Sequence, residues 1–187
     1  MKILFNAFKS WLPLAATIVF LCGVIEVAVQ QNFRMGANDP QIQLAEDTAR
    51  ALQSGQPASE LIPAGKVDIA LSLAPYLVVY GPDFQPSAGN GILHDNLPAI
   101  PDGVFLSAAK EGRNMVTWQP EPGVRNAVVV VPVNGGKGGY VLAGRSLREV
   151  EVREDDLTKI CAAGIAGTRA ATLVLTLLLE ILPVKPR

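Results

Sequence analysis

The sequence predicts an α+β fold in which a five-stranded antiparallel sheet with flanking helices lies between two transmembrane helices. Composition points to a membrane, because 49% of the 187 residues are hydrophobic and the excess lies at the two ends of the chain. The middle of the chain changes from helical to strand periodicity and back again. The length leaves room for one domain of modest size between the two apolar segments.

The first apolar run predicts a transmembrane helix over residues 11–30, after a cytoplasmic N-terminus of residues 1–10. Glu26 is its only charge, and about 20 apolar residues cross a bilayer. A cleaved signal peptide is the alternative, since a short basic start followed by an apolar run also fits one. The sequence favours an uncleaved span because no small-x-small cleavage site follows Glu26.

The second apolar run predicts a transmembrane helix over residues 159–184, followed by a tail of residues 185–187. Arg169 and Glu180 interrupt this run, so its longest uncharged stretch is residues 170–179. An arginine at the centre of a span costs roughly 2.5–3.5 kcal/mol on insertion scales. The leucine-rich stretch can offset that cost, and a second span is therefore expected.

Basic residues at both ends of the chain predict that both termini lie in the cytoplasm, by the positive-inside rule. These residues are Lys2, Lys9, Lys185 and Arg187. The middle domain, residues 31–158, is then extracytoplasmic. Because few residues follow the second span, we expect no output domain there, and any signal must pass laterally to a partner membrane protein.

Helix and strand periodicities alternate along the middle domain. A helix is expected to start at Asp39, with Pro40 in its first turn, and to stop at Gly55. Two further helices are expected at 67–74 and 103–111. The expected strands are residues 76–80, 84–88, 114–119, 126–132 and 139–143.

The exit from the last expected strand has a capping signal. Ser146 followed by Glu149 has the spacing of a capping box. The helix that begins there changes from polar to apolar near Ile160. We therefore expect one helix to leave the sheet and continue into the second span.

Three motifs carry a resemblance to known proteins: Asn38-Asp-Pro-Gln41, Thr117-Trp-Gln-Pro120 and Ala143-Gly-Arg-Ser-Leu-Arg-Glu149. With the order of elements, they make residues 39–156 resemble a PAS-like or Cache-like sensor domain of uncharacterised bacterial two-span membrane proteins. The resemblance implies a sheet wrapped by helices on one side, in a protein of the bacterial inner membrane. It carries over no enzymatic activity and no ligand, because fold analogy does not establish function.

Four residues of the expected sheet are candidate ligand-binding residues: Tyr80, Trp118, Arg125 and Arg145. In a PAS-like fold, strand side chains that face the helices line the ligand cavity, and an arginine can bind a carboxylate with two hydrogen bonds. The alternative is a packed tryptophan with two arginines that are solvated or that cap a helix.

Glu26 lies inside the first expected span and Arg169 inside the second, and their charges are opposite. If the spans are antiparallel, Arg169 can extend toward the outer boundary and pair with Glu26. This predicts an intramembrane ion pair between the two helices.

The remaining chemistry of the sequence gives no catalytic or metal site. His94-Asp95 lies in a loop without a nucleophile motif, so a solvated loop is the favoured interpretation. Cys22 and Cys161 lie in or beside the apolar runs and match no zinc spacing. No cofactor is expected. The net charge of -1 and the lack of a Lys/Arg cluster give no indication of nucleic-acid binding.

The sequence therefore predicts a membrane-anchored, sensor-like domain that is not an enzyme. Its expected partners are the lipid bilayer, a small-molecule ligand, and either another membrane protein or a second copy of the chain. A non-sensing accessory or assembly subunit of a membrane complex is the alternative. An anchored hydrolase is a third, less favoured interpretation.

Overall fold

The chain divides into two compact units. The computed structural model describes residues 2–135 and 138–181. Residues 1–33 and 152–187 belong to one unit, here called the helical unit, and residues 34–151 form the other, here called the sheet unit. Residues 182–187, which hold the end of the predicted second span and the predicted tail, lie outside the described residues.

Helix α1, Lys2–Gln53, is one continuous helix. The sequence predicts two helices here, with a new start at Asp39 and Pro40, and that prediction is wrong. Between the two expected helices, residues 31–38 contain no proline, and Gly36 is their only glycine. The helix therefore continues through them, and it also continues through Pro40, which cannot donate a backbone hydrogen bond. In the sheet unit α1 ends in turns that begin at Ser54 and Gly55.

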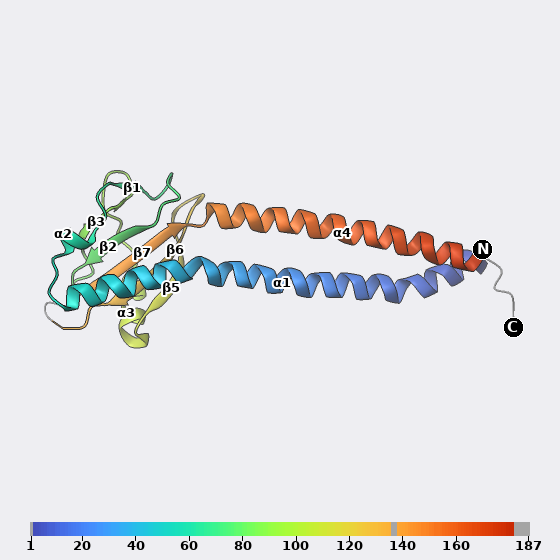
Figure 1. Cartoon of the computed structure of the whole chain (residues 1–187), viewed down its shortest axis with the longest axis horizontal. Coiled ribbons are helices and arrows are strands. Elements are labelled where there is room, and N and C mark those ends of the chain that lie inside the picture. Colours follow the sequence, from blue (N-terminus) through green and yellow to red (C-terminus); the bar gives the residue numbers. More distant parts are fainter. Residues whose placement is uncertain (1, 136–137, 182–187) are drawn as a thin grey trace. The chain divides into compact units, whose positions relative to one another are not determined.

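The sheet unit has the expected α+β composition (Figure 1). Its elements after α1 are α2 (Ala58–Leu61), β1 (Val67–Asp68), β2 (Tyr76–Tyr80), β3 (Pro86–Gly89), β4 (Gly91–Ile92), α3 (Asp102–Glu111), β5 (Asn114–Glu121), β6 (Val124–Pro132) and β7 (Tyr140–Ser146). Five of them form an antiparallel sheet in the order β3-β2-β7-β6-β5. The prediction of a five-stranded antiparallel sheet is confirmed.

The helix expected at residues 67–74 does not form. Val67 and Asp68 instead pair in parallel with β4. The Asp68 carboxylate accepts a hydrogen bond from the Ala70 amide at 2.9 Å, which closes a turn directly after the pairing. A short aspartate side chain that bonds to the backbone two residues later favours a turn over a helix.

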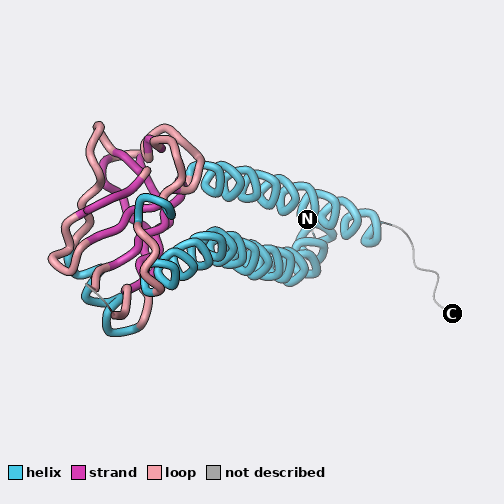
Figure 2. Tube along the Cα trace, turned by 60° about the vertical axis from the view of Figure 1, so that its left-hand side comes forward, coloured by secondary structure: helices cyan, strands magenta, loops and turns pink. Residues whose placement is uncertain are grey.

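Helices pack on both faces of the five-stranded sheet. One face, here called the α1 face, packs against α1 through Ala45, Ala49, Leu77, Val129, Val131, Val141 and Ala143. The other, here called the α3 face, packs against α3 and its flanking loops through Ile69, Tyr76, Val78, Tyr80, Ile100, Phe105, Ala108, Val128, Val130 and Leu142. Figure 2 shows the strands and helices of the chain in separate colours. The one-sided arrangement that the resemblance implied is therefore wrong.

The helical unit consists of the first part of α1 and most of α4 (Arg148–Ile181). Both helices are long and apolar enough to cross a membrane. The indole nitrogen of Trp11 donates hydrogen bonds to the Arg169 carbonyl and to the Thr172 hydroxyl, each at 3.1 Å. Thr158 donates to the Glu26 carboxylate at 3.0 Å. Early residues of α1 thus meet late residues of α4, so the two helices run antiparallel.

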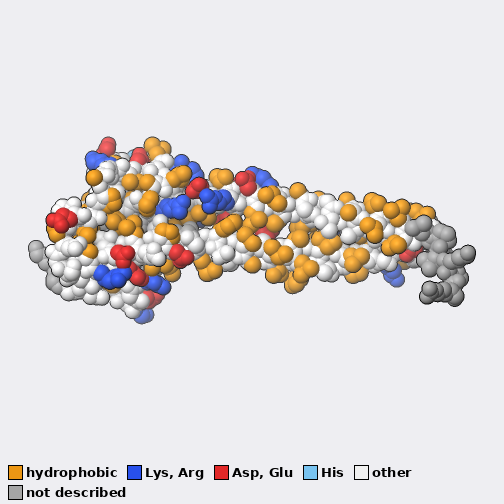
Figure 3. All heavy atoms as spheres, viewed as in Figure 1, with side chains coloured by type: hydrophobic (Ala, Val, Ile, Leu, Met, Phe, Trp, Pro, Cys, Tyr) orange, Lys and Arg blue, Asp and Glu red, His pale blue; other side chains and the backbone are white. Residues whose placement is uncertain are grey.

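Large apolar side chains remain exposed along both helices of this unit (Figure 3). On α1 they include Leu4, Phe5, Phe8, Leu12, Leu14, Phe20, Val24 and Ile25. On α4 they include Ile160, Val174, Leu175, Leu178, Leu179 and Ile181. Exposed apolar surface of this extent is typical of a lipid-facing or protein-facing helix and not of a surface in water.

The start of α4 lies within two residues of the predicted cap. The Ser146 hydroxyl accepts a hydrogen bond from the Arg148 amide at 3.3 Å, while the Glu149 carboxylate accepts one from the Arg145 guanidinium at 3.1 Å. Ser146 is the last residue of β7 and Arg148 the first of α4. One residue therefore separates the sheet from the long helix. The sequence predicts that the helix begins here, but it ends the last strand at residue 143, three residues too early.

We expect Gly144→Ala to lower the stability of the sheet unit. A Cβ atom at Gly144 would overlap the Tyr76 ring, and overpacking of a core typically costs about 1–3 kcal/mol. Gly103→Ala is the matched control, because nothing lies within 4 Å of a Cβ there and alanine favours the helix. Thermal unfolding of the full-length chain in detergent measures both. Equal effects of the two substitutions would contradict the packing described here.

Candidate functional site

The α3 face contains a buried polar cluster at the end of the sheet nearest α4. It is formed by Tyr76 on β2, Asn126 on β6 and Ser146 on β7, and is here called the polar cluster. Asn126 pairs with Ser146, and Tyr76 pairs with Gly144 two residues before it. Because strand side chains alternate, all three lie on the same face as Val128. They are 1%, 0% and 6% exposed in chain order.

Three polar atoms of this cluster have no hydrogen-bond partner among the described residues. They are the Tyr76 hydroxyl and both the oxygen and the nitrogen of the Asn126 amide. A buried polar group without a partner costs about 1–3 kcal/mol, and such groups are few in native proteins. Two side chains of this kind, both on the α3 face, make the polar cluster the candidate site of this sheet.

Two glycines shape the cluster. The Tyr76 ring occupies the space that a side chain at Gly91 or Gly144 would need. Gly144 is the partner of Tyr76 on β7, so the ring lies across β7 in the direction of β6, which carries Asn126. Sequence reasoning missed Tyr76 and Asn126, although an asparagine at the head of the run Ala127–Val131 is unusual in a buried strand.

Trp118, one of the predicted ligand-binding residues, borders the cluster. It pairs with Asn126 across β5 and β6 and packs, partly buried, against the core of the α3 face. Tyr80 lies on the same face but at the other end of the sheet, where its pair is Tyr140. The Tyr80 hydroxyl donates to the Pro98 carbonyl at 2.6 Å. The structure thus brings Trp118 to the polar cluster but not Tyr80.

Aromatic rings fill the Tyr80 end of the α3 face. Phe105 contacts Tyr80, Phe84 and Tyr140 with ring centroids 4.9, 5.0 and 5.1 Å away. Rings at such separations stabilise a core beyond their buried area. This end of the face is packed, so Tyr80 serves as a core residue that ties the loop at Pro98 to the sheet.

Arg125 and Arg145 lie on the opposite face from Trp118. Asn126 and Ser146 face α3, and Arg125 and Arg145 are the residues directly before them. Because side chains alternate along a strand, the two arginines point toward the α1 face. Arg145 pairs with Glu149 and Arg125 pairs with Glu151. These ion pairs attach the first turn of α4 to the ends of β6 and β7. The alternative interpretation is that these arginines are solvated or cap a helix; in the structure both instead form ion pairs with glutamates of α4.

A third arginine also anchors α4. The Arg148 guanidinium donates hydrogen bonds to the carbonyls of Ala70 and Leu71, at 2.7 and 3.3 Å. These carbonyls follow Ile69, which belongs to the core of the α3 face. The start of α4 is therefore attached both to the sheet and to the loop that covers it.

The structure does not bring Glu26 and Arg169 together. Glu26 accepts its hydrogen bond from Thr158, which is eleven residues before Arg169 and so about 16 Å away along α4. The Arg169 guanidinium lies over the Trp11 ring, 5.7 Å from its centroid. The predicted ion pair fails because the antiparallel register places the two charges at different levels of the helical unit.

The loop at His94 has a structural explanation. His94 and Asp95 have φ values of 49° and 63°, and Leu93 and Asn96 exchange two backbone hydrogen bonds. This is a two-residue turn of type I′, which favours residues that tolerate positive φ. The His94 ring lies 2.9 Å from the Glu121 carboxylate, and the histidine is largely exposed. No group of three metal-ligating side chains gathers anywhere in the described part of the chain.

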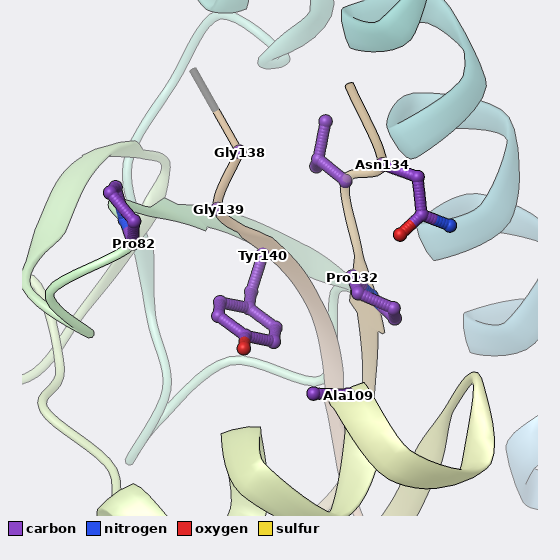
Figure 4. Close-up of a pocket in the computed structure, with 8 residues that line it drawn as sticks. Pro82, Ala109, Pro132, Asn134, Gly138, Gly139 and Tyr140 are labelled. Atoms are coloured by element: carbon purple, nitrogen blue, oxygen red, sulfur yellow. The ribbon is translucent and has the colours of Figure 1, made fainter. Parts of the chain in front are cut away.

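A pocket of about 250 Å³ lies beside the β6–β7 hairpin (Figure 4). Its lining includes Pro82, Ala109, Pro132, Asn134 and Tyr140. The Tyr140 ring stands between the two prolines. The pocket is at the end of the sheet remote from Ser146, because Tyr140 and Ser146 are the two ends of β7. Sequence reasoning also missed this pocket, which depends on the packing of α3 against the hairpin.

No family model, curated protein or solved structure matches this chain.

Replacing Asn126 by leucine is expected to stabilise the sheet unit. Leucine removes two unpartnered polar atoms from a buried site, which favours folding by about 1–3 kcal/mol. Asn90→Leu is the matched control: Asn90 is also buried, but its side chain accepts a hydrogen bond from the Leu77 amide at 2.7 Å. The Asn90→Leu variant is expected to be less stable than the wild type by a similar amount, because the Leu77 amide loses its acceptor. Denaturant unfolding of the full-length protein compares the two, and a destabilised Asn126→Leu protein would mean that the amide is already satisfied.

Alkaline pH is expected to destabilise the sheet unit through its buried tyrosines. Burial raises the pKa of Tyr76 and of Tyr80 above the ordinary value of 10.0, and for Tyr76 the charge of an ionised Tyr80 adds to the effect. The unfolded chain therefore loses these protons first. Stability from this source is constant below pH 10 and falls above it by about 1.4 kcal/mol per pH unit for each tyrosine. Tyr76→Phe should halve the tyrosine-linked slope, measured by denaturant unfolding at several alkaline pH values.

Proposed function

We propose that this chain is a membrane-anchored sensor-like protein. In this proposal α1 and α4 span the bacterial inner membrane, and the sheet unit is an extracytoplasmic PAS-like or Cache-like domain. The polar cluster binds a small molecule, and α4 passes the effect of binding to another membrane protein beside it. The proposal rests on one observation above the others: three buried, unpartnered polar atoms lie where the sheet continues into α4.

The chemistry of the cluster limits the ligand class. The Asn126 amide offers one acceptor and two donors, and the Tyr76 hydroxyl can donate or accept. None of these groups is charged at neutral pH, and burial of an unpaired charge beside them would be costly. The expected ligand is therefore small and uncharged, and it carries at least one donor and one acceptor. The Trp118 side chain offers it an apolar neighbour.

Contacts around the cluster suggest how occupancy would act on α4. Ser146 belongs to the cluster and also accepts the hydrogen bond of the Arg148 amide. A ligand that competes for the Ser146 hydroxyl would weaken that cap, and one that leaves it free would preserve it. The pairs Arg125–Glu151 and Arg145–Glu149 hold the same turn of the helix. Small movements of β6 or β7 would therefore be transmitted to the first residues of α4.

The architecture supports the sensor proposal at the level of fold only. A five-stranded antiparallel sheet with the expected order of elements is the feature that the resemblance to PAS-like and Cache-like domains predicts. Two helices of sufficient length and hydropathy support anchoring in a membrane. Neither feature identifies a ligand. The support for ligand binding therefore comes from the unpartnered atoms of the polar cluster.

A non-sensing accessory subunit is the second candidate, and a separate observation favours it. The Tyr80 end of the α3 face is filled with aromatic rings. Large apolar side chains of the sheet unit are also exposed, among them Leu71 at 73%, Leu106 at 59% and Met115 at 47%. A filled core with exposed apolar residues suits a protein that binds another protein.

A thermal-shift screen of the full-length protein in detergent against uncharged polar metabolites tests the proposal. A ligand at 100 times its dissociation constant contributes about 2.7 kcal/mol, so the midpoint should rise by several degrees. The shift should disappear in Asn126→Leu and persist in Asn134→Ala, which alters the hairpin pocket instead. A well-folded protein that responds to no compound class would favour the accessory-subunit function.

A further inference from the structure

Arg169 lies within the apolar part of α4, and the sensor proposal gives its charge no role. Its side chain is exposed in the helical unit. One face of the guanidinium lies over the Trp11 ring, 5.7 Å from the centroid. The backbone carbonyl of Arg169 also accepts a hydrogen bond from the Trp11 indole. The tryptophan therefore holds both the helix and the guanidinium at this point.

No acidic side chain is available to neutralise Arg169 within the described helical unit. Residues 162–176 of α4 contain no Asp or Glu, and neither do residues 3–19 of α1 around Trp11. Glu26 lies at another level of the unit and is bonded to Thr158. Glu180 is eleven residues farther along α4, about 16 Å away. A tryptophan ring attracts a cation but does not neutralise its charge.

The position of Arg169 within α4 places it deep in the apolar stretch. This stretch runs from Ile160 to Ile181, so Arg169 lies about 13 Å from its beginning and about 18 Å from its end. Ionisable residues at such depth are rare in transmembrane helices, and they pair with an opposite charge or face a cavity. Lipid phosphates lie outside a hydrocarbon layer about 30 Å thick. A carboxylate within a neighbouring span is therefore the nearer counter-charge.

The residues around Arg169 allow another helix to approach closely. Ala166 and Ala162 precede Arg169 by three and seven residues, on the same side of the helix, and both are exposed. Small side chains let transmembrane helices pack with a short distance between their axes. A second copy of this chain in the same orientation would place Arg169 against Arg169, so a partner of opposite charge fits better.

We propose that Arg169, held against Trp11, is the docking point for a transmembrane helix of another protein that carries an Asp or Glu at the same depth. This inference rests on the proposed function, because it identifies the chemistry of the partner that receives the signal. The carboxylate of the partner forms an ion pair with the exposed guanidinium. The Trp11 ring keeps the guanidinium oriented, so that binding orders only the partner side chain.

A model transmembrane peptide tests the inference without knowledge of the partner. The full-length chain is reconstituted in phosphatidylcholine vesicles with a leucine-rich peptide that carries one central Asp, and energy transfer reports their association. The matched peptide carries Asn in place of Asp. We expect the Asp peptide to bind about tenfold more tightly, which corresponds to about 1.4 kcal/mol. Arg169→Gln should abolish the preference, and Lys159→Gln, which removes the partner of Asp156, should retain it.

Other outcomes overturn the inference. Equal binding of the two peptides, or an Asp preference that persists in Arg169→Gln, would show that Arg169 is not the docking point. Loss of the preference when phosphatidylglycerol is added would assign the guanidinium to an anionic lipid headgroup. Arg169→Gln should still give the ligand-induced thermal shift, so failure of peptide binding alone leaves the sensor proposal standing. A wild-type chain that alkaline extraction removes from the vesicles would contradict both proposals.

Discussion

The central strand β7 is the constraint on which the sheet unit depends. It pairs with β2 on one side and β6 on the other, and its residues Val141 to Gly144 are buried. The strand forms backbone hydrogen bonds to both neighbours and packs against side chains on both faces of the sheet. These interactions leave little freedom for its position. Because only one residue separates its end from α4, the same contacts set where the first turn of α4 begins.

The elements with clear local signals were predictable, and those that depend on distant contacts were not. The helix at residues 103–111 and the strands around β5, β6 and β7 agree closely with their sequence patterns. The runs Leu77–Val79 and Ala127–Val131 are hydrophobic without alternation, which is typical of strands buried on both faces. The prediction of helices on one side of the sheet did not use this signal. By contrast, nothing local in residues 67–74 indicates a partner strand more than 20 residues later.

The candidate site illustrates the same limit at the level of side chains. Once the register of β5, β6 and β7 is known, the alternation of side chains assigns each residue to a face of the sheet. Trp118 and Asn126 then lie on the α3 face, and Arg125 and Arg145 lie on the α1 face. The register depends on pairing across the sheet, and a single sequence does not supply it. An asparagine at the start of a valine-rich strand is unusual, so the sequence alone could have drawn attention to Asn126. The missing partners of its amide and of Tyr76 became visible only when the packed α3 face was described.

Asn126 and Arg169 are among the described groups that depart from the rules that stabilise the rest of the protein. Asn126 is a polar side chain without a partner in a packed core, and Arg169 is a charge without a counter-charge in an apolar helix. Each departure costs free energy that an apolar residue would avoid. Sequences tend to retain such costs where function requires them, and stabilising replacements are therefore often available at functional positions. The polar cluster lies at the strand that leads into α4, and Arg169 lies within α4 itself. A ligand that satisfies the first group and a partner that satisfies the second would thus act on one continuous helix, and that continuity is the physical basis for linking them.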